Sequence, residues 1–493
     1  MNGRRLGRAL GCSLCAILAW ACSGGHDSGD SPARPNLVLV VLDTTRPDLL
    51  SAYGYSEATT PFLDTFASQA TRFERAYSSS CWTLPAHATM FSGELPGVHR
   101  ATQSTGRIDA SVPLLAEILN AAGYATAGFS VNPWIGKKSG LSRGFETFER
   151  IESTKQSWLA GETSDKAAGR SVPARRVSRW LRKRGEGTRP FFLFVNLMRA
   201  HHPFVPTPQA GEQLLGFDPP ALRGAIEEFY PELPGGHARS LMNRHYAGHD
   251  PLSPEEWERL GGLYKASLRS VDDELRAVLA AVDRSSEPES TLVLVVSDHG
   301  ESLGEHGHFG HILNLYETSL RVVFLARGPG FGAGLSDDRP VHLADVHATL
   351  LAAAQVAPDS DRAPGAGLDL ARPRPDQRVL AASLEGPRLQ LKPFTEDVLQ
   401  SGALDVYRRA AWTAIGGRYK LILRSDDSEE LYDLQLDPEE LRPLAADSVS
   451  DEHLTPLRES VQAQRSQMSA GSEAELEFDA EMLESLRGLG YVK

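Results

Sequence analysis

Residues Asn36–Asp43 read NLVLVVLD, and residues Thr291–His299 read TLVLVVSDH. Each is a near-continuous run of Val and Leu that reaches an aspartate, which is the pattern of a strand buried on both faces of a parallel sheet. In open α/β sheets, ligands bind beyond the carboxyl ends of such strands. The two runs therefore predict that Asp43, Asp298 and His299 meet at one edge of a sheet. Two carboxylates and an imidazole suit a divalent metal ion in type and number.

A third segment has the same pattern. Pro190–Leu197 reads PFFLFVNL and predicts another buried strand, after which the chain reaches His201 and His202. Taken alone, Asp43 is equally well explained as an Asx turn or a helix N-cap. Three strands that deliver metal-binding or catalytic residue types to one edge favour a functional site instead.

The segment Cys81–His87, CWTLPAH, supplies a possible nucleophile. Pro85 suits the first turn of a helix, because the N–H that proline lacks would have no partner there. We expect this helix to run from about Pro85 to Phe91 and to stop near Gly93. Thr83 would then lie at or just before a helix N-terminus, where free N–H groups favour an anion. Thr83 could simply cap the helix, but beside the predicted metal-binding edge we favour a nucleophilic hydroxyl.

The chain resembles the sulfatase branch of the alkaline phosphatase superfamily. The matching segments, in the family's order, are NLVLVVLDTTRPD, TTPFLDTFA, WTLPAHATMFSG, FVNLMRAHHPF, SDHGESLGEHGHFGH and LYETSLRVV, followed by the weaker GRYKLIL, EELYDLQLDPEELRPL and LRGLGYVK. They span roughly Pro35 to Lys493. The resemblance implies an α/β fold: an alkaline-phosphatase-like central, mostly parallel sheet flanked by helices, with a smaller C-terminal α+β subdomain.

The resemblance also implies roles for individual residues. It makes Asp43, Asp298 and His299 metal ligands, with Thr83 as the fourth ligand and the nucleophile. His201 and His311 match positions that contact the transferred group, so we expect them in catalysis and substrate binding. His87 takes the place of the arginine in the family's Cys/Ser-x-Pro-x-Arg signature and is a further candidate substrate-binding residue.

Two nearby sets of residues keep alternative interpretations. Arg46 is a candidate for contacting substrate oxygens, but a structural ion pair explains it equally well. His306 and His308 are either part of the site or ordinary loop histidines.

Two departures from the family pattern bear on the chemistry. Thr44 stands where sulfatases usually carry a second aspartate, which argues for one metal ion (Ca, Zn or Mn) rather than two. Thr83 cannot be oxidised to formylglycine, and Cys81 lies two residues too early for the signature, so we expect no formylglycine and an ordinary thiol at Cys81. A threonine ester must be cleaved by a second displacement, which is typical of phosphoryl-transfer members.

These observations predict an exported, metal-dependent hydrolase that cleaves sulfuric or phosphoric esters through a Thr83 covalent intermediate. The substrate would be a small molecule or a glycan or lipid ester. The net charge of −13 argues against nucleic acid as a partner. One alternative is an envelope phosphoryl-group transferase, although such enzymes usually carry several membrane-spanning helices. Another is an inactive binding protein of the same fold, which the retained Asp43, Thr83, Asp298 and His299 argue against.

Residues 1–22 have the pattern of an export signal. Three arginines precede the apolar stretch Ala9–Ala21, which is shorter than the roughly 20 residues of a membrane-spanning helix. Leu18–Cys22, LAWAC, approximates a bacterial lipobox and predicts lipidation of Cys22, whereas Ala19–Ala21 also fits simple signal peptidase cleavage. We therefore expect the bacterial cell envelope, either with a membrane anchor through an N-terminal lipid or in the periplasm, and otherwise secretion.

The rest of the chain divides by composition. We expect a flexible linker at 23–35, a catalytic domain at 36–357, a second linker at 358–377 and a C-terminal subdomain with a helical tail at 378–493. Thr207–Pro254 is rich in Pro, Gly and charge and predicts either a lid or a long surface loop. Asp272 and Asp273 lie within a strongly helical pattern, where we expect an exposed or packing pair rather than metal ligands.

Overall fold

The computed structural model describes residues 34–151, 171–185, 189–230, 241, 245–246, 251–311, 313–357, 366–385, 405 and 409–469. They belong to one compact unit, Arg34–Lys493. The predicted signal segment with Cys22, and residues 23–33 of the predicted linker, lie outside the described residues. Within the described residues, no helix has the length and apolar composition needed to cross a membrane.

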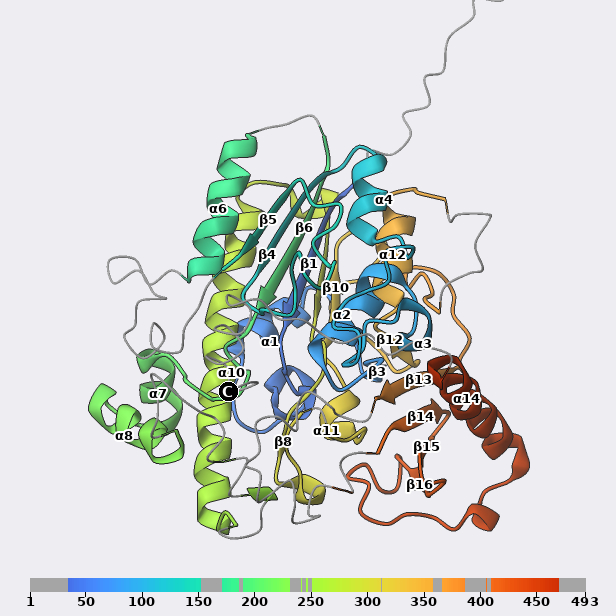
Figure 1. The fold of residues 1–493 in the computed structure, drawn as a ribbon. Helices are drawn as coiled ribbons and strands as arrows, with labels where there is room; N and C mark the ends of the chain where they lie inside the picture. The colour runs from blue at the N-terminus through green and yellow to red at the C-terminus, as the bar shows by residue number, and fades with distance from the viewer. Residues whose placement is uncertain are drawn as a thin grey trace, which may run out of the picture. The chain divides into compact units, whose positions relative to one another are not determined.

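The centre of the fold is an eight-stranded sheet with the order β11-β2-β10-β7-β1-β6-β4-β5 (Figure 1). Five neighbouring strands, β7-β1-β6-β4-β5, run parallel, while β10 is antiparallel to both β7 and β2. The predicted, mostly parallel α/β sheet is therefore confirmed. The strands are β1 (Asn36–Leu42), β2 (Thr71–Phe73), β4 (Ala125–Ser130), β5 (Thr147–Arg150), β6 (Phe191–Leu197), β7 (Thr291–Val296), β10 (Phe324–Arg327) and β11 (Leu335–Asp337).

The three strands predicted from apolar runs lie side by side in the middle of this sheet. Every residue of β6 and β7 is buried, and so is every residue of β1 after Asn36. Both faces of these strands are covered, which explains why their sequences show no alternation of polar and apolar residues.

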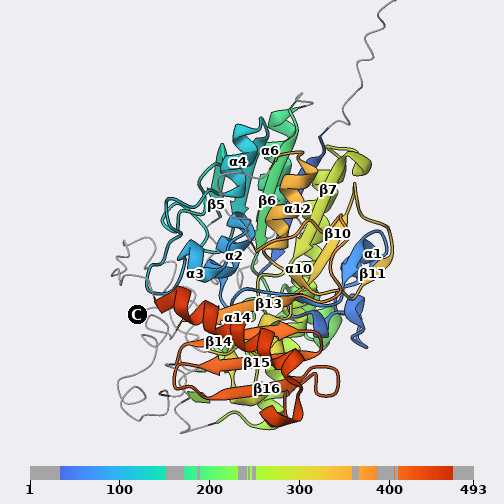
Figure 2. The same cartoon turned by 90° about the vertical axis from the view of Figure 1, so that its right-hand side faces the viewer.

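Helices cover both faces of the sheet (Figures 1 and 2). On one face lie α6 (Val172–Arg184) and the long α10 (Pro254–Asp283), and on the other lie α2 (Thr83–Ser92), α4 (Leu115–Ala121) and α12 (Asp345–Ala353). α10 begins with a capping box formed by Ser253 and Glu256 and with proline at its first position. The remaining short elements are α1 (Pro61–Ala67), α3 (Pro96–His99), α11 (Glu317–Leu320), and the two-stranded pairs β3 (Ala76–Tyr77) with β12 (Val341–His342) and β8 (Ser302–Leu303) with β9 (Phe309–Gly310).

The segment predicted as a lid or surface loop contains two helices, α7 (Pro208–Leu215) and α8 (Pro219–Phe229). Thr207 and Asp218 cap them through side-chain oxygens that accept backbone N–H bonds, and each cap is followed by proline. Residues 231–240, 242–244 and 247–250 of this segment lie outside the described residues.

Asp272 and Asp273 are packing residues, as expected. Asp272 is buried and accepts the backbone N–H groups of Phe62 and Leu63, so it caps the N-terminus of α1 from a neighbouring helix. Asp273 forms an ion pair with Arg276.

A second, antiparallel sheet follows in the C-terminal part. Its strands β13 (Val379–Leu384), β14 (Ala411–Gly416), β15 (Tyr419–Arg424) and β16 (Glu429–Asp433) pair in sequence order, and α14 (Asp451–Ser469) packs on one face. Side chains of the other face, such as Leu380 and Ile422, join an apolar cluster with Tyr77, Cys81 and Leu320 of the N-terminal part. This agrees with the predicted C-terminal α+β subdomain, although residues 470–493 of the predicted tail lie outside the description.

Candidate active site

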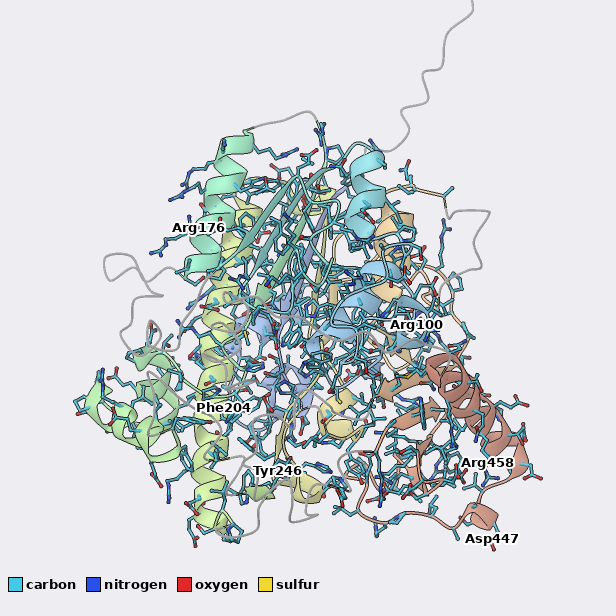
Figure 3. All side chains as sticks on the ribbon, viewed as in Figure 1. Arg100, Arg176, Phe204, Tyr246, Asp447 and Arg458 are labelled. Carbon is cyan, nitrogen blue, oxygen red and sulfur yellow. The ribbon has the colours of Figure 1, made fainter. Side chains whose placement is uncertain are left out.

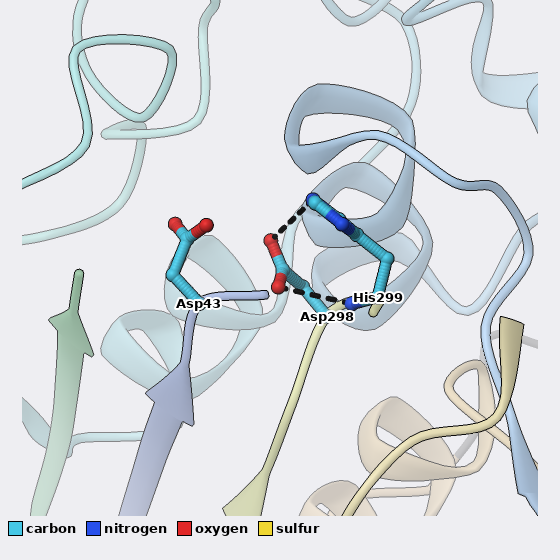
Figure 4. A group of neighbouring side chains, drawn as sticks. All are labelled: Asp43, Asp298 and His299. Atoms are coloured by element: carbon cyan, nitrogen blue, oxygen red, sulfur yellow. Dashed lines mark hydrogen bonds and ion pairs between the residues drawn. The ribbon is translucent and has the colours of Figure 1, made fainter. Parts of the chain in front are cut away.

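The three predicted metal ligands meet at the carboxyl edge of the sheet. Asp43 directly follows β1, and Asp298 and His299 follow β7, whose last residue Val296 is paired with Val41 of β1. Figure 4 shows Asp298 between Asp43 and His299, beyond the two strand ends. One ligand atom from each of the three residues lies within 4.8 Å of the others, and all three residues are fully buried.

The chemistry of this group fits a divalent cation. Asp43 Oδ1 and Asp298 Oδ2 are buried and have no hydrogen-bond partner in the described part of the chain. The Nδ1–H of His299 donates to the carbonyl of Gly300 at 3.0 Å, which leaves a lone pair on Nε2, 3.3 Å from Asp298 Oδ2. A lone pair and a carboxylate oxygen repel each other at that distance, so a cation between them would turn repulsion into coordination.

The electrostatics of the metal-free protein lead to the same conclusion. Burial raises the pKa of Asp43 to about 7, and the charge of Asp298 contributes to the increase. Burial likewise raises the pKa of Asp298 to about 7 and lowers that of His299 to about 4. A bound cation would keep both carboxyl groups ionised, and the neutral imidazole could coordinate it without first losing a proton.

Asp298 is fixed by the backbone around it. Its Oδ1 accepts the N–H groups of Thr44 at 3.1 Å and of His299 at 3.0 Å, which leaves Oδ2 directed toward the imidazole. Thr44 has a positive φ of 54°, an unusual conformation for a β-branched residue. The strained residue is thus one whose N–H group holds the carboxylate of Asp298.

Thr83 is the first residue of α2, and its side chain is directed into the site. Its Oγ1 lies 3.3 Å from His299 Nε2 and 3.2 Å from the side-chain nitrogen of Asn132. The N-cap position belongs to Trp82, which makes no capping hydrogen bond. The predicted location at a helix N-terminus is correct, whereas the alternative that Thr83 merely caps the helix is wrong.

Two asparagines that the sequence analysis missed complete this part of the site. The amide nitrogen of Asn132 donates to Asp43 Oδ2 at 2.8 Å and to Thr83 Oγ1, while its oxygen accepts the N–H of Trp134 at 2.9 Å. Asn196 donates to the same oxygen of Asp43 at 3.0 Å. The available signals were an amide inside the apolar strand β6 and an amide two residues beyond β4, at the same edge of the sheet.

His87 lies one helical turn after Thr83 and is fully buried. Its Nδ1–H donates to the carbonyl of Thr83 at 2.9 Å and lies 3.6 Å from Asp298 Oδ2. The ring meets Phe91 and Phe194 edge-on, and burial lowers its pKa to about 3. His87 is therefore a neutral imidazole and brings no positive charge to the site.

The two other predicted histidines form a row with His299. The ring centres of His299 and His311 are 4.6 Å apart, and those of His311 and His201 are 4.8 Å apart. His311 Nδ1 lies 3.1 Å from Oε1 of Glu301, a fully buried carboxylate that the sequence analysis also missed. Its signal was an acidic residue two positions after His299. A carboxylate that holds Nδ1–H leaves Nε2 of His311 as the proton-accepting nitrogen.

Arg46, His306 and His308 take part in structural contacts. The guanidinium of Arg46 bonds to Asp48, to Glu305 at 2.6 Å and to the carbonyl of Glu301, so the structure favours the ion-pair interpretation. His306 stacks on Tyr316 with ring centres 3.8 Å apart, and the ring of His308 lies 5.9 Å from the same tyrosine.

Comparisons with known proteins show which family the chain belongs to. The family model for sulfatases matches residues 35–356. Choline-sulfatase of Rhizobium meliloti (strain 1021) is 25% identical over 452 residues, which cover 84% of this chain and 82% of that protein. Human arylsulfatase K is 23% identical over 376 residues, covering 68% and 66% of the two chains. The crystal structure of the phosphonate monoester hydrolase of Agrobacterium radiobacter superimposes with a TM-score of 0.63 at 20% identity, over 88% of this chain and 96% of that one. The model match covers most of the chain, so the protein belongs to the sulfatase family of ester hydrolases, within the alkaline phosphatase superfamily.

Proposed function

We propose that the protein hydrolyses a sulfuric or phosphoric ester in two displacements, with Thr83 as the nucleophile. The observation that carries this proposal is the position of Thr83 Oγ1, 3.3 Å from His299 Nε2, on the first residue of a helix and beside two buried aspartates. A hydroxyl at a helix N-terminus and beside a cation site is well placed to attack an anionic ester.

Asp43, Asp298, His299 and Thr83 would hold one divalent ion. When bound, the ion supplies positive charge that lowers the pKa of the Thr83 hydroxyl and offsets the charge that develops on the transferred group. Asn132 keeps Oγ1 of Thr83 oriented through the 3.2 Å hydrogen bond. His201 is the candidate for contacts to the oxygens of that group. Neutral His87 already donates its Nδ1–H to the carbonyl of Thr83 and has no second N–H to offer them.

We assign the proton transfers on the leaving-group side to His311. In the first displacement, Thr83 Oγ1 bonds to sulfur or phosphorus, and the ester bond breaks with its electron pair on the leaving oxygen. The Thr83 hydroxyl gives up its proton to water, and His311 Nε2 gives a proton to the leaving oxygen, on the opposite side of the transferred group. In the second displacement, the neutral His311 takes a proton from the water that attacks from that side, and Thr83 Oγ1 regains a proton from water as it leaves. Glu301 orients the ring through Nδ1, 3.1 Å away, although burial lowers the pKa of His311 to about 4 in the metal-free protein.

Cys81 is not expected to carry formylglycine. Its side chain is buried and packs in the apolar cluster with Leu380 and Ile422 of the second sheet. Thr83, two residues later, is the side chain that lies beside Asp43 and His299.

The relatives suggest the range of substrates. They include a choline-sulfatase and a phosphonate monoester hydrolase, and another similar solved structure is a complex with its substrate, D-glucosamine-2-N,6-O-disulfate. We propose that this chain acts on a small-molecule, glycan or lipid ester of this kind. We further propose that Cys22 carries a lipid, which would anchor the exported enzyme to a membrane of the bacterial envelope.

The test is a panel of p-nitrophenyl sulfate, p-nitrophenyl phosphate, bis-p-nitrophenyl phosphate and p-nitrophenyl phenylphosphonate, measured on protein loaded with Ca, Zn or Mn. We expect turnover of at least one substrate, its loss in Thr83→Ala, and retention in Cys81→Ala. Two displacements at a chiral phosphorothioate give net retention of configuration. Full activity in Thr83→Ala, inversion at phosphorus, or formylglycine at Cys81 by peptide mass spectrometry would contradict the mechanism.

A further inference from the structure

The helix α6 carries an unusual concentration of positive charge for a protein with a net charge of −13. Its sequence VPARRVSRWLRKR contains six basic residues among 13 and no acidic one. Pro173, Ala174, Val177 and Leu181 form its buried side, so the basic residues occupy the opposite side. Arg179, Arg182 and Lys183 are exposed and have no acidic partner among the described residues.

The basic end of α6 lies at the amino edge of the sheet. Arg184, in its last turn, donates to the carbonyl of Arg189 and lies over the ring of Phe191, the first residue of β6. Arg189 in turn donates to the carbonyls of Gly123 and Tyr124, just before β4. Partial burial and the nearby charge of Arg189 lower the pKa of Arg184, as expected where like charges gather.

The first described residues, which follow the predicted membrane tether, lie at the same edge of the sheet. Arg34, the first described residue, donates to the carbonyl of Ala122 at 2.6 Å, and the Tyr124 hydroxyl donates to the carbonyl of Pro35 at 3.1 Å. Arg34 follows Cys22 by twelve residues, which can span at most about 40 Å. A lipid on Cys22 would therefore keep this edge close to the bilayer.

The proposed catalytic residues lie at the other end of the same strands. β1 runs from Asn36, next to the tether, to Leu42, next to Asp43. Seven residues of strand separate the two edges by about 23 Å. A basic surface meant to attract substrate would be expected at the carboxyl edge, so its place at the amino edge favours a partner other than the substrate.

We infer that the amino-edge basic surface docks on anionic phospholipid head groups and holds the active site on the side away from the membrane. This surface consists of Arg34, Arg179, Arg182, Lys183, Arg184 and Arg189. Glu146 pairs with Arg189 at 2.7 Å and Glu149 pairs with Arg176 at 2.9 Å, and exposed Glu287 and Glu289 precede β7 at the same edge. The net positive charge of this edge therefore lies on α6. Basic residues beside an anionic bilayer each strengthen binding about fivefold, and a lipid chain combined with a basic patch gives stable, oriented anchoring. The inference does not depend on the proposed reaction.

The test compares two charge-matched triple variants in the full chain carrying Cys22→Ser, so that acylation does not dominate binding. One variant is Arg179→Gln/Arg182→Gln/Lys183→Gln on α6. The control is Arg442→Gln/Arg458→Gln/Arg465→Gln in the C-terminal part, whose Arg458 lies far from Arg176 of α6 in Figure 3. Vesicles of pure phosphatidylcholine, and of phosphatidylcholine with 30% phosphatidylglycerol, are floated at low and high salt.

We expect the α6 variant to bind the phosphatidylglycerol vesicles about 100-fold more weakly than the parent at low salt. The control should stay within a few-fold of the parent, and both variants should keep the parental Tm in thermal melts, which shows that they are folded. Equal binding of the α6 and control variants, or parental binding that is the same with and without phosphatidylglycerol, would overturn the inference. Loss of binding to dextran sulfate in the α6 variant, with unchanged binding to vesicles, would also overturn it and would assign the surface to an anionic glycan.

Discussion

Replacing Asn132 by alanine should remove a neutral hydrogen-bond donor that contacts both a proposed metal ligand and the proposed nucleophile. Its amide nitrogen lies 2.8 Å from Asp43 Oδ2 and 3.2 Å from Thr83 Oγ1. Loss of a donor to an oxygen on which charge develops lowers kcat by about 10²–10³. Loss of a hydrogen bond to a ligand's carboxylate weakens metal affinity by about 10–100-fold. We therefore expect both effects in Asn132→Ala.

Asn196→Ala is the control, because Asn196 donates to the same oxygen of Asp43 at 3.0 Å without touching Thr83. Its oxygen also accepts the backbone N–H of Asn132 at 3.1 Å, so we expect weaker metal affinity with only a small loss of kcat. Steady-state kinetics measured over a metal titration separate the effect on kcat from the effect on metal affinity. At saturating metal, we expect Asn196→Ala to recover most of the parental kcat, whereas Asn132→Ala should remain about 10²-fold slower or worse.

Alanine at position 132 also removes the acceptor for the N–H of Trp134, so thermal melts must accompany the kinetics. Asn132→Asp keeps that acceptor and the shape of the side chain, but it replaces the donor with a carboxylate beside Asp43. It should be at least as slow as Asn132→Ala. Equal kcat for Asn132→Ala and Asn196→Ala at saturating metal would refute the proposed contact between Asn132 and the nucleophile.

Three further changes test other parts of the structure. Glu301→Ala should lower kcat by about 10–100-fold with little change in KM, because the ring of His311 loses its partner. Glu301→Gln keeps an oxygen acceptor and should recover part of the rate in the same assay. Asp272→Ala should lower the free energy of unfolding by about 1–3 kcal/mol in urea melts, since two N–H groups at the start of α1 lose their acceptor, whereas Asp273→Ala should change it by less than about 0.5 kcal/mol. Because burial raises the pKa of Asp43 and Asp298 to about 7, these groups bind protons in the metal-free protein at pH 5 and mostly lose them by pH 8. Because their pKa is higher in the folded than in the unfolded state, the metal-free protein becomes less stable as pH rises from about 4 to 7. The increase in Tm on adding metal should therefore be larger at pH 8 than at pH 5. An equal increase at both pH values would contradict the ligand assignment.

The centre of the fold could be predicted because its strands carry a strong local signal. β1, β6 and β7 are buried on both faces, and this burial is recorded in their sequences as unbroken apolar runs. The helices α7 and α8 were not predicted, because the Pro- and Gly-rich composition of their segment suggested a loop. The relevant signal was local: Thr207 before Pro208 and Asp218 before Pro219, each a capping residue followed by proline.

The charged part of the site was easier to predict than the neutral part. Aspartates and histidines after apolar strands suggest a metal site on chemical grounds alone. An asparagine carries no such indication, and Asn132 lies 89 residues from the aspartate that it contacts. The role of Arg46 also depended on tertiary structure, since its partner Glu305 lies 259 residues away.

The order of the strands explains why the charged and neutral groups of the site are separated. The sequence of neighbours β7-β1-β6-β4 places Asp298, Asp43, Asn196 and Asn132 in a row along the carboxyl edge, with neighbouring strands about 4.8 Å apart. The two carboxylates occupy the half that would hold a cation, and the two amides occupy the other half. Thr83 lies between them, because its hydroxyl contacts His299 on one side and Asn132 on the other. A carboxylate at position 132 would extend negative charge to the side from which an anionic ester must approach, so a neutral donor is the group that can both orient the nucleophile and tolerate the substrate.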